Sequence, residues 1–255
     1  SFSAEGELSF SVKEGSTLSV SSNVGEALGI GDGLTSYVDT GKTLGSLGNF
    51  DAKTGTLTFR DAQGQPIVVT GKLMDKVPTS EWVKQKDGTY TDLSGNKLDS
   101  EGYRLSRDGE RLYEFSLTVN GVKTGTFTQD TALETVINSI NSNTEAGLNV
   151  SYSKLTNEFV FTAKETGEGG RIEIGSSEQG DLGAALFGVV DKSDSEHYTA
   201  GQDAIFQATV NGQKMVLTRS SNTFDIDGMS ITLQGLFNNN ATSDSIASKQ
   251  ADETL

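Results

Sequence analysis

The sequence predicts a mainly β protein, of the α+β type with few short helices, made of two β-rich domains with antiparallel sheets or sandwiches. Three observations support this prediction. Apolar residues alternate with polar ones over short stretches, which is the period of a half-buried strand. Thirty glycines and only two prolines in 255 residues are typical of many short strands joined by tight turns. One stretch has the apolar spacing of an amphipathic helix.

Residues 1–110 are predicted to form the first β-rich domain. Apolar and polar side chains alternate over residues 8–12, which predicts a strand, and a second strand begins at Leu18. A short helical turn is predicted over residues 24–30, where glycines end it.

Two further strands are predicted in this domain, over residues 55–60 and 66–70, with a turn at residues 61–64 between them. The stretch 84–108 is very polar, which predicts exposed hairpins or a loop. Its turn signals are Asp87-Gly88, Ser94-Gly95-Asn96 and Asp108-Gly109, sequences that tolerate positive φ.

Residues 111–195 give the clearest signals and are predicted to form one repeat unit. Alternating apolar residues over 115–119 lead into Asn120-Gly121, the strongest short-range hairpin signal. Residues 126–128 are predicted to form the second strand of this hairpin. A helix is predicted over residues 131–143. Its apolar face is Leu133, Val136, Ile137 and Ile140, at spacings of i, i+3, i+4 and i+7.

Thr131 and Glu134 fit a capping box, in which each side chain bonds a free backbone amide at the start of the helix. After the helix, strands are predicted over residues 148–152 and 158–162. A third strand over residues 171–174 and a short apolar turn over 182–187 follow.

Residues 196–255 are predicted to form a β-hairpin region that completes the second domain, after a polar linker at residues 191–200. Asn211-Gly212 and Asp227-Gly228 each separate two apolar stretches and predict hairpin turns. The tail, residues 238–255, is polar and is expected to be loosely ordered.

A weak internal repeat relates the N-terminal residues to the repeat unit predicted at residues 111–195. Residues 10–14 resemble residues 161–165, and both precede a strand and a corner containing Leu and Gly. We therefore interpret residues 1–40 as the second half of such a unit, and residues 1–110 as an inserted domain or an incomplete repeat. The sequence begins at Ser1 without Met, so we interpret it as an excised fragment or a processed chain.

The composition excludes several functional classes. The net charge of −15 disfavours binding to nucleic acids and to anionic membranes, and no apolar stretch approaches the roughly 20 residues that span a bilayer. The absence of cysteine excludes disulfides and thiolate metal sites. With one histidine, a histidine-based zinc site is excluded as well.

No residue is predicted to be catalytic, cofactor-binding or metal-binding. His197 lies in a polar stretch without a nucleophile motif near it, so we interpret it as a surface residue. Trp82 is interpreted as a core or loop anchor. Asp225-Ile226-Asp227-Gly228 lacks the further oxygen ligands of a calcium loop and is interpreted as a turn. We therefore predict that the chain is not an enzyme and uses no cofactor.

Several short motifs resemble a known family. Four of them are similar to the short repeat shared by flagellins and hook-associated proteins: Thr118–Val122, the helix at 131–143, Ala146-Gly147 and Val150–Tyr152. Five motifs in order over residues 201–235 resemble the C-terminal region of the bacterial flagellar filament cap family (hook-associated protein 2). They are Gly201–Ala204, Val210–Gly212, Arg219–Phe224, Ile226–Gly228 and Ile231–Gly235. Thr43–Leu47 is similar to a further segment of that family.

The resemblance implies β-rich head domains of an extracellular protein that is exported by the flagellar secretion system. Such a protein would oligomerise with itself at the filament tip, cap it and promote flagellin polymerisation. The helical legs, which contribute much of the contact between subunits in the family, are not found in this sequence.

Three alternatives stay open. The chain could be another flagellar axial protein, such as a flagellin or a hook-junction component. It could be an extracellular adhesin for a host surface or mucin, or a carbohydrate-binding module. It could also be an acidic hydrolase, which would need two carboxyl groups with shifted pKa values in one cleft.

Overall fold

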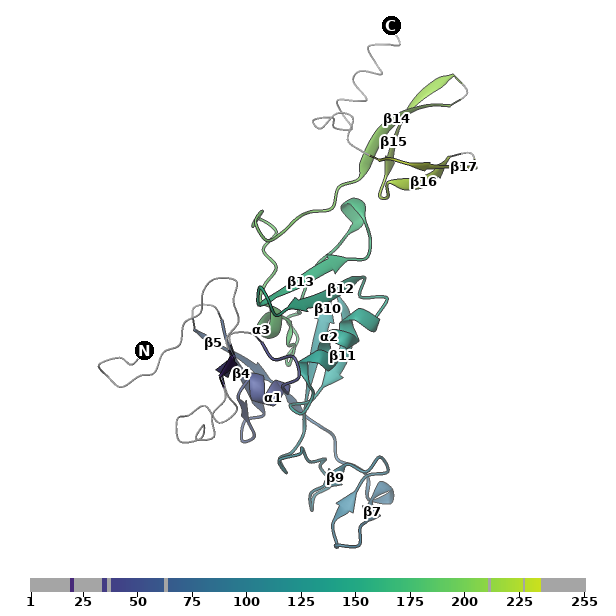
Figure 1. Cartoon of the computed structure of the whole chain (residues 1–255). Coiled ribbons are helices and arrows are strands. Elements are labelled where there is room, and N and C mark those ends of the chain that lie inside the picture. Colours follow the sequence, from purple (N-terminus) through teal and green to yellow (C-terminus); the bar gives the residue numbers. More distant parts are fainter. Residues whose placement is uncertain are drawn as a thin grey trace, which may run out of the picture. The chain divides into compact units, whose positions relative to one another are not determined.

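The computed structural model describes residues 19–20, 34–35, 38–61, 64–210, 212–226 and 228–234. Over these residues the protein is mainly β, with several small antiparallel sheets, and only one of its three α-helices has seven or more residues (Figure 1). The chain divides into two compact units. Unit 1 holds residues 1–162 and 174–189, and unit 2 holds residues 163–173 and 190–255.

The core of unit 1 forms around two sheets and the longest helix. The first sheet has the order β11-β10-β6 and the second has the order β3-β4-β5. Their strands are β3 (Phe50–Asp51), β4 (Thr56–Arg60), β5 (Pro66–Thr70), β6 (Lys72–Leu73), β10 (Tyr113–Val119) and β11 (Val122–Phe127). The helix α2 (Leu133–Ser142) packs against β11 and β12 (Leu148–Ser153), which pairs with β13 (Glu158–Ala163).

Local sequence explains why these elements form. The turn between β10 and β11 is Asn120-Gly121, with φ of 51° and 79°, which is the conformation of a two-residue hairpin turn. Leu133, Val136, Ile137 and Ile140 are buried on one face of α2, as predicted. The predicted strand pairs at 55–70 and 148–162 are confirmed by β4–β5 and β12–β13.

The predicted capping box of α2 is wrong. The Thr131 hydroxyl accepts a hydrogen bond from the Thr128 amide at 2.9 Å, so it closes the preceding turn instead. The helix begins at Leu133, and Ala132 precedes it without a side-chain cap. Its first amides are satisfied by a distant segment, because Leu133 N donates to Lys42 O and Glu134 N to Thr40 O.

The predicted strand at residues 171–174 is also wrong, since only Ile174 forms an isolated bridge, to Val119. The residues after Ile174 run beside β10 without forming a regular strand. Gly175 N donates to Thr118 O, and Leu182 N donates to Ser116 O. The apolar turn predicted at 182–187 contains the short helix α3 (Gly183–Phe187).

Three short elements precede this core in the sequence. The helix α1 (Leu44–Leu47) begins after Thr43, whose hydroxyl accepts from Ser46 N. The strands β1 (Ser19–Val20) and β2 (Leu34–Thr35) pair with each other. The predicted strand at 8–12, the helical turn at 24–30 and the first copy of the internal repeat lie outside the described residues.

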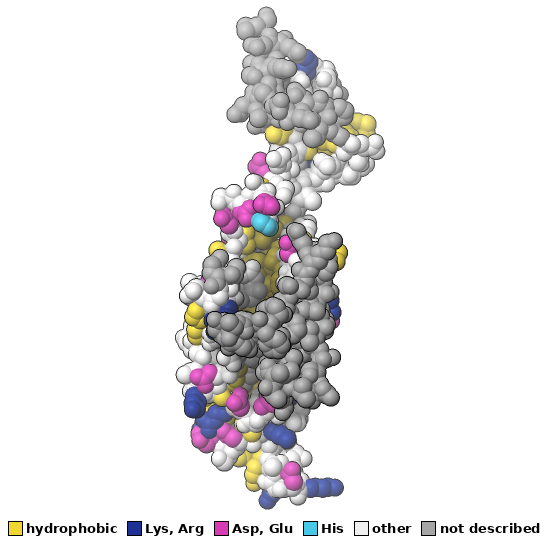
Figure 2. Space-filling view, turned by 60° about the vertical axis from the view of Figure 1, so that its left-hand side comes forward, with side chains coloured by type: hydrophobic (Ala, Val, Ile, Leu, Met, Phe, Trp, Pro, Cys, Tyr) yellow, Lys and Arg dark blue, Asp and Glu magenta, His cyan; other side chains and the backbone are white. Residues whose placement is uncertain are grey.

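Unit 2 contains two hairpins: β14 (Ala204–Val210) with β15 (Gln213–Arg219), and β16 (Thr223–Ile226) with β17 (Met229–Thr232). They confirm the hairpins predicted around Gly212 and Gly228, and both glycines have φ of 81°. The rings of Phe206 and Phe224 stack at 4.7 Å between the hairpins. The described side chains of these strands are at most half-buried, and hydrophobic ones lie at the surface (Figure 2).

Unit 2 also contains the 3-10 helix at Gly167–Gly169. The Glu168 amide donates to the Asp203 carboxylate at 2.8 Å, which connects this helix to the chain just before β14.

No helix in the described parts of the chain is long and apolar enough to cross a membrane. The predicted domain boundaries at residues 110 and 195 stay predictions.

Candidate functional site

Two of the residues considered for chemistry from the sequence, His197 and Asp225, lie among the described residues. His197 is exposed, and its Nδ1 is 2.8 Å from a carboxylate oxygen of Asp194, within the same turn. Figure 2 shows this histidine beside acidic side chains at the surface. Asp225 is exposed on β16, and Asp227 lies outside the described residues.

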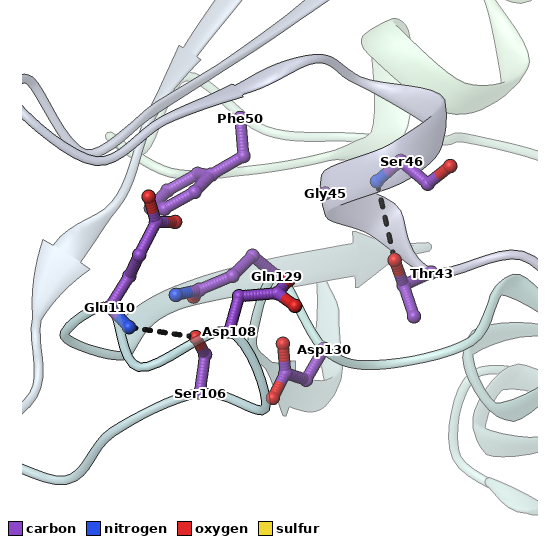
Figure 3. Close-up of a pocket in the computed structure, with 9 residues that line it drawn as sticks. All are labelled: Thr43, Gly45, Ser46, Phe50, Ser106, Asp108, Glu110, Gln129 and Asp130. Atoms are coloured by element: carbon purple, nitrogen blue, oxygen red, sulfur yellow. Dashed lines mark hydrogen bonds between the residues drawn. The ribbon is translucent and has the colours of Figure 1, made fainter. Parts of the chain in front are cut away.

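A polar cavity of about 220 Å³ lies in unit 1 (Figure 3). The Gln129 side chain forms part of its lining, and it is engaged at both ends: Oε1 accepts from Tyr113 N and Nε2 donates to Arg111 O. The carboxylate of Asp130 accepts from Arg107 N at 2.8 Å. The full lining is Thr43, Gly45, Ser46, Phe50, Ser106, Asp108, Glu110, Gln129 and Asp130.

The hydrogen bonds of this cavity fix the backbone around it. Gln129 and Asp130 hold residues 107–113 against the loop before α2. Among the residues that the structure describes, no group of three or more histidine, aspartate or glutamate side chains could hold a metal ion. Ser106, Asp108 and Glu110 in the lining belong to the last turn of the region described next.

The most distinctive surface of unit 1 is built from four consecutive heptapeptides, residues 85–91, 92–98, 99–105 and 106–112, which we call the heptapeptide arm. Its short strands are β8 (Tyr90–Thr91) and β9 (Lys97–Leu98), and β7 (Val83–Lys84), which leads into it, pairs with β8 in the order β7-β8-β9. Isolated bridges extend this ladder to Arg104 and Arg111. In Figure 1, β7 and β9 lie apart from α2 and β10.

Each heptapeptide makes the same turn. The amide of its first residue donates to the carbonyl of the fifth at 2.7–2.9 Å, and the amide of its glycine donates to the carbonyl of the first at 3.0–3.1 Å. The glycines have φ between 85° and 91°, the left-handed conformation that follows a type I turn in a three-residue hairpin loop. They are Gly88, Gly95, Gly102 and Gly109.

Ion pairs join neighbouring heptapeptides of the arm. Arg104 Nε donates to Asp92 at 2.6 Å, and Arg111 Nε donates to Asp99 at 2.7 Å, so both pairs join residues twelve apart. Each aspartate also accepts two backbone amides of its own turn. Each carboxylate therefore accepts hydrogen bonds from its own turn and from an arginine of the next heptapeptide, and so it holds neighbouring turns together.

The electrostatics of the arm follow from these bonds. Burial alone would raise the pKa of Asp92, but hydrogen bonds from Asn96, Arg104 and Ser94 outweigh it and lower that pKa to about 2. Burial likewise opposes the backbone and Arg111 hydrogen bonds that lower the pKa of Asp99. These carboxylates are therefore charged at neutral pH and serve as acceptors.

The arm confirms the exposed hairpins expected at residues 84–108 but was not predicted as a repeat. The signal was present, because glycines recur every seven residues from Gly88 to Gly109. Trp82 is half-buried beside the arm, and its indole nitrogen donates to Val77 O at 2.9 Å, which agrees with its interpretation as an anchor.

Comparison with known proteins gave no match: no family, no curated protein and no solved structure is significantly similar to this chain.

Proposed function

We propose that this chain is a structural and assembly protein that caps the flagellar filament tip and promotes flagellin polymerisation. It would act outside the cell, after export by the flagellar secretion system, through surface contacts with flagellin and with copies of itself. It would carry no catalytic site, use no cofactor, and contact neither nucleic acid nor membrane.

The ordered motifs over residues 201–235 carry this proposal. In the described part of that segment, the motifs that resemble the cap family lie on or directly beside β14 to β17, two hairpins whose apolar side chains stay at most half-buried. The hairpin, helix and hairpin over residues 113–163 agree with the flagellin-type repeat proposed for 111–195. Half-exposed hairpins suit a protein that works by contact with other proteins.

Deletion of the gene in the source bacterium tests the proposal. We expect flagellin to appear in the growth medium and filaments to be lost, and the intact gene to restore them. A complementing gene that lacks the codons for residues 201–234 should fail to restore filaments. Full filaments in the deleted strain would refute the proposal.

Two alternatives give different outcomes in the same strains. A flagellin or other axial protein would be labelled by antibodies along the filament or at its base instead of at the tip. An adhesin would leave filaments intact in the deleted strain, while binding to mucin-coated surfaces would be lost.

A further inference from the structure

The chain that leads into the heptapeptide arm is fastened to the third turn of the arm. This leading segment, residues 74–82, is called the strap. Val77 N donates to Gly102 O at 2.9 Å, and Trp82 Nε1 donates back to Val77 O at 2.9 Å. Val77 is 3% exposed, so the contact is sealed from water although the arm around it is largely exposed.

Gly102 differs from the equivalent glycines of the arm. A Cβ placed on it would lie 2.8 Å from the Trp82 ring and 3.1 Å from Val77 O. A Cβ at Gly88, Gly95 or Gly109 would meet nothing within 4 Å. The four glycines share their positive φ, so the close approach of the strap is the feature that sets Gly102 apart.

Charged groups reinforce the same contact. Lys76 Nζ is 3.5 Å from Glu101 and 4.8 Å from the centre of the Tyr103 ring. Arg111 Nη2 also lies 2.8 Å from a carboxylate oxygen of Glu101, so Glu101 connects the strap to the last heptapeptide. We call the group Lys76, Val77, Trp82, Glu101 and Gly102 the clasp.

The clasp lies between two halves of the arm that are anchored differently. The inner half, residues 99–112, is bonded to the core of unit 1. Gln129 Nε2 donates to Arg111 O at 2.8 Å, and Arg107 N donates to Asp130 at 2.8 Å. The outer half consists of the first two heptapeptides together with β7 and the end of the strap, residues 78–98 in all. It meets the inner half through the ladder, the Asp92–Arg104 pair and the contact of Trp82 with Gly102.

We propose that the clasp is a conformational device that holds the outer half of the arm closed, and that its opening releases this half as one unit. The outer half buries few apolar side chains, so its stability depends on hydrogen bonds and the clasp, and such segments open locally at low free energy. Opening withdraws Trp82 from Gly102 and exposes Val77, while the inner half stays with the core.

The test compares Gly102→Ala with Gly95→Ala in the full chain. Both changes strain a backbone of positive φ, but only Gly102→Ala displaces Trp82. Hydrogen exchange followed by mass spectrometry should be about tenfold faster over residues 78–98 in Gly102→Ala than in Gly95→Ala, with residues 113–150 unchanged. The emission of Trp82, the only tryptophan, should shift to the red.

Two outcomes would overturn the proposal. Exchange over residues 78–98 that is no faster than in Gly95→Ala would show that the clasp does not hold the outer half. Equally fast exchange over residues 113–150 would show that arm and core open together. If Gly102→Ala fails to fold, Trp82→Phe serves instead, because it removes the indole donor without straining the backbone, and the same exchange pattern decides.

Discussion

The β10–β11 hairpin and the heptapeptide arm are both antiparallel ladders with glycine turns, but different interactions stabilise them. Phe115, Leu117 and Val119 of β10 are at most 1% exposed and belong to the buried core of unit 1. In the arm, Asp92 is among the most buried side chains at 4% exposure, and it bonds Arg104. Apolar burial stabilises the first ladder, whereas carboxylate hydrogen bonds and repeated turns stabilise the second.

This difference has a consequence for how each region tolerates change. A core residue has many packing partners, so its loss leaves a cavity. A residue of the arm has few partners with defined geometry, so the effect of a substitution depends on which hydrogen bonds it removes. In Figure 2 basic and acidic side chains are interspersed at the lower end, where the arm lies.

The largest effect is expected in the core. Leu117→Ala removes a fully buried side chain and should lower the free energy of unfolding by about 2–5 kcal/mol, measured by chemical denaturation with circular dichroism. Leu93→Ala, in the arm at 73% exposure, is the control and should change it by less than about 0.5 kcal/mol. Equal losses for the two would contradict the contrast between core and arm.

A smaller effect is expected at the arm's buried carboxylate. Asp92→Asn places an amide where Arg104 donates, and should cost about 1–3 kcal/mol of arm stability, followed by Trp82 fluorescence during denaturation. Asp87 is exposed, and its Oδ1 accepts two bonds within its own turn. Asp87→Asn keeps an oxygen acceptor there, so no loss beyond about 0.5 kcal/mol is expected.

The lowered pKa of Asp92 predicts how the stability of the arm responds to acid. The pKa of Asp92 is lowered from 3.8 to about 2 in the folded arm, so its charged form stabilises the fold. This contribution is complete above about pH 4 and is lost as the pH falls toward 2. Trp82 fluorescence should report this loss, and Asp92→Asn should be much less sensitive to acid. Identical acid profiles would rule out Asp92 as the cause.

The smallest effect should be the same in both regions. Gly121 in the β10–β11 turn and Gly95 in the arm have φ of 79° and 87°, and a Cβ at either would meet nothing within 4 Å. Alanine at either position should therefore cost only the strain of a left-handed backbone, about 1–2 kcal/mol. Denaturation of the two variants measures it, and a much larger cost at Gly95 would mean that the arm's turns depend on neighbours.

The sequence by itself determined the elements whose cause is local. Asn120-Gly121 specifies its turn because both residues tolerate positive φ, and the spacing of Leu133, Val136 and Ile140 specifies the buried face of α2. The glycines at seven-residue spacing specify the turns of the arm, although the repeat they form was not recognised from them.

The tertiary structure decided everything that depends on a distant partner. The start of α2 is set by carbonyl groups of Thr40 and Lys42, more than ninety residues before it, so its own capping pattern was a poor guide. The Arg104–Asp92 pair and the contact between Trp82 and Gly102 exist only once strands lie side by side. The physical reason is that a hydrogen bond or close contact depends on position in space, which alternation and turn signals along the chain do not encode.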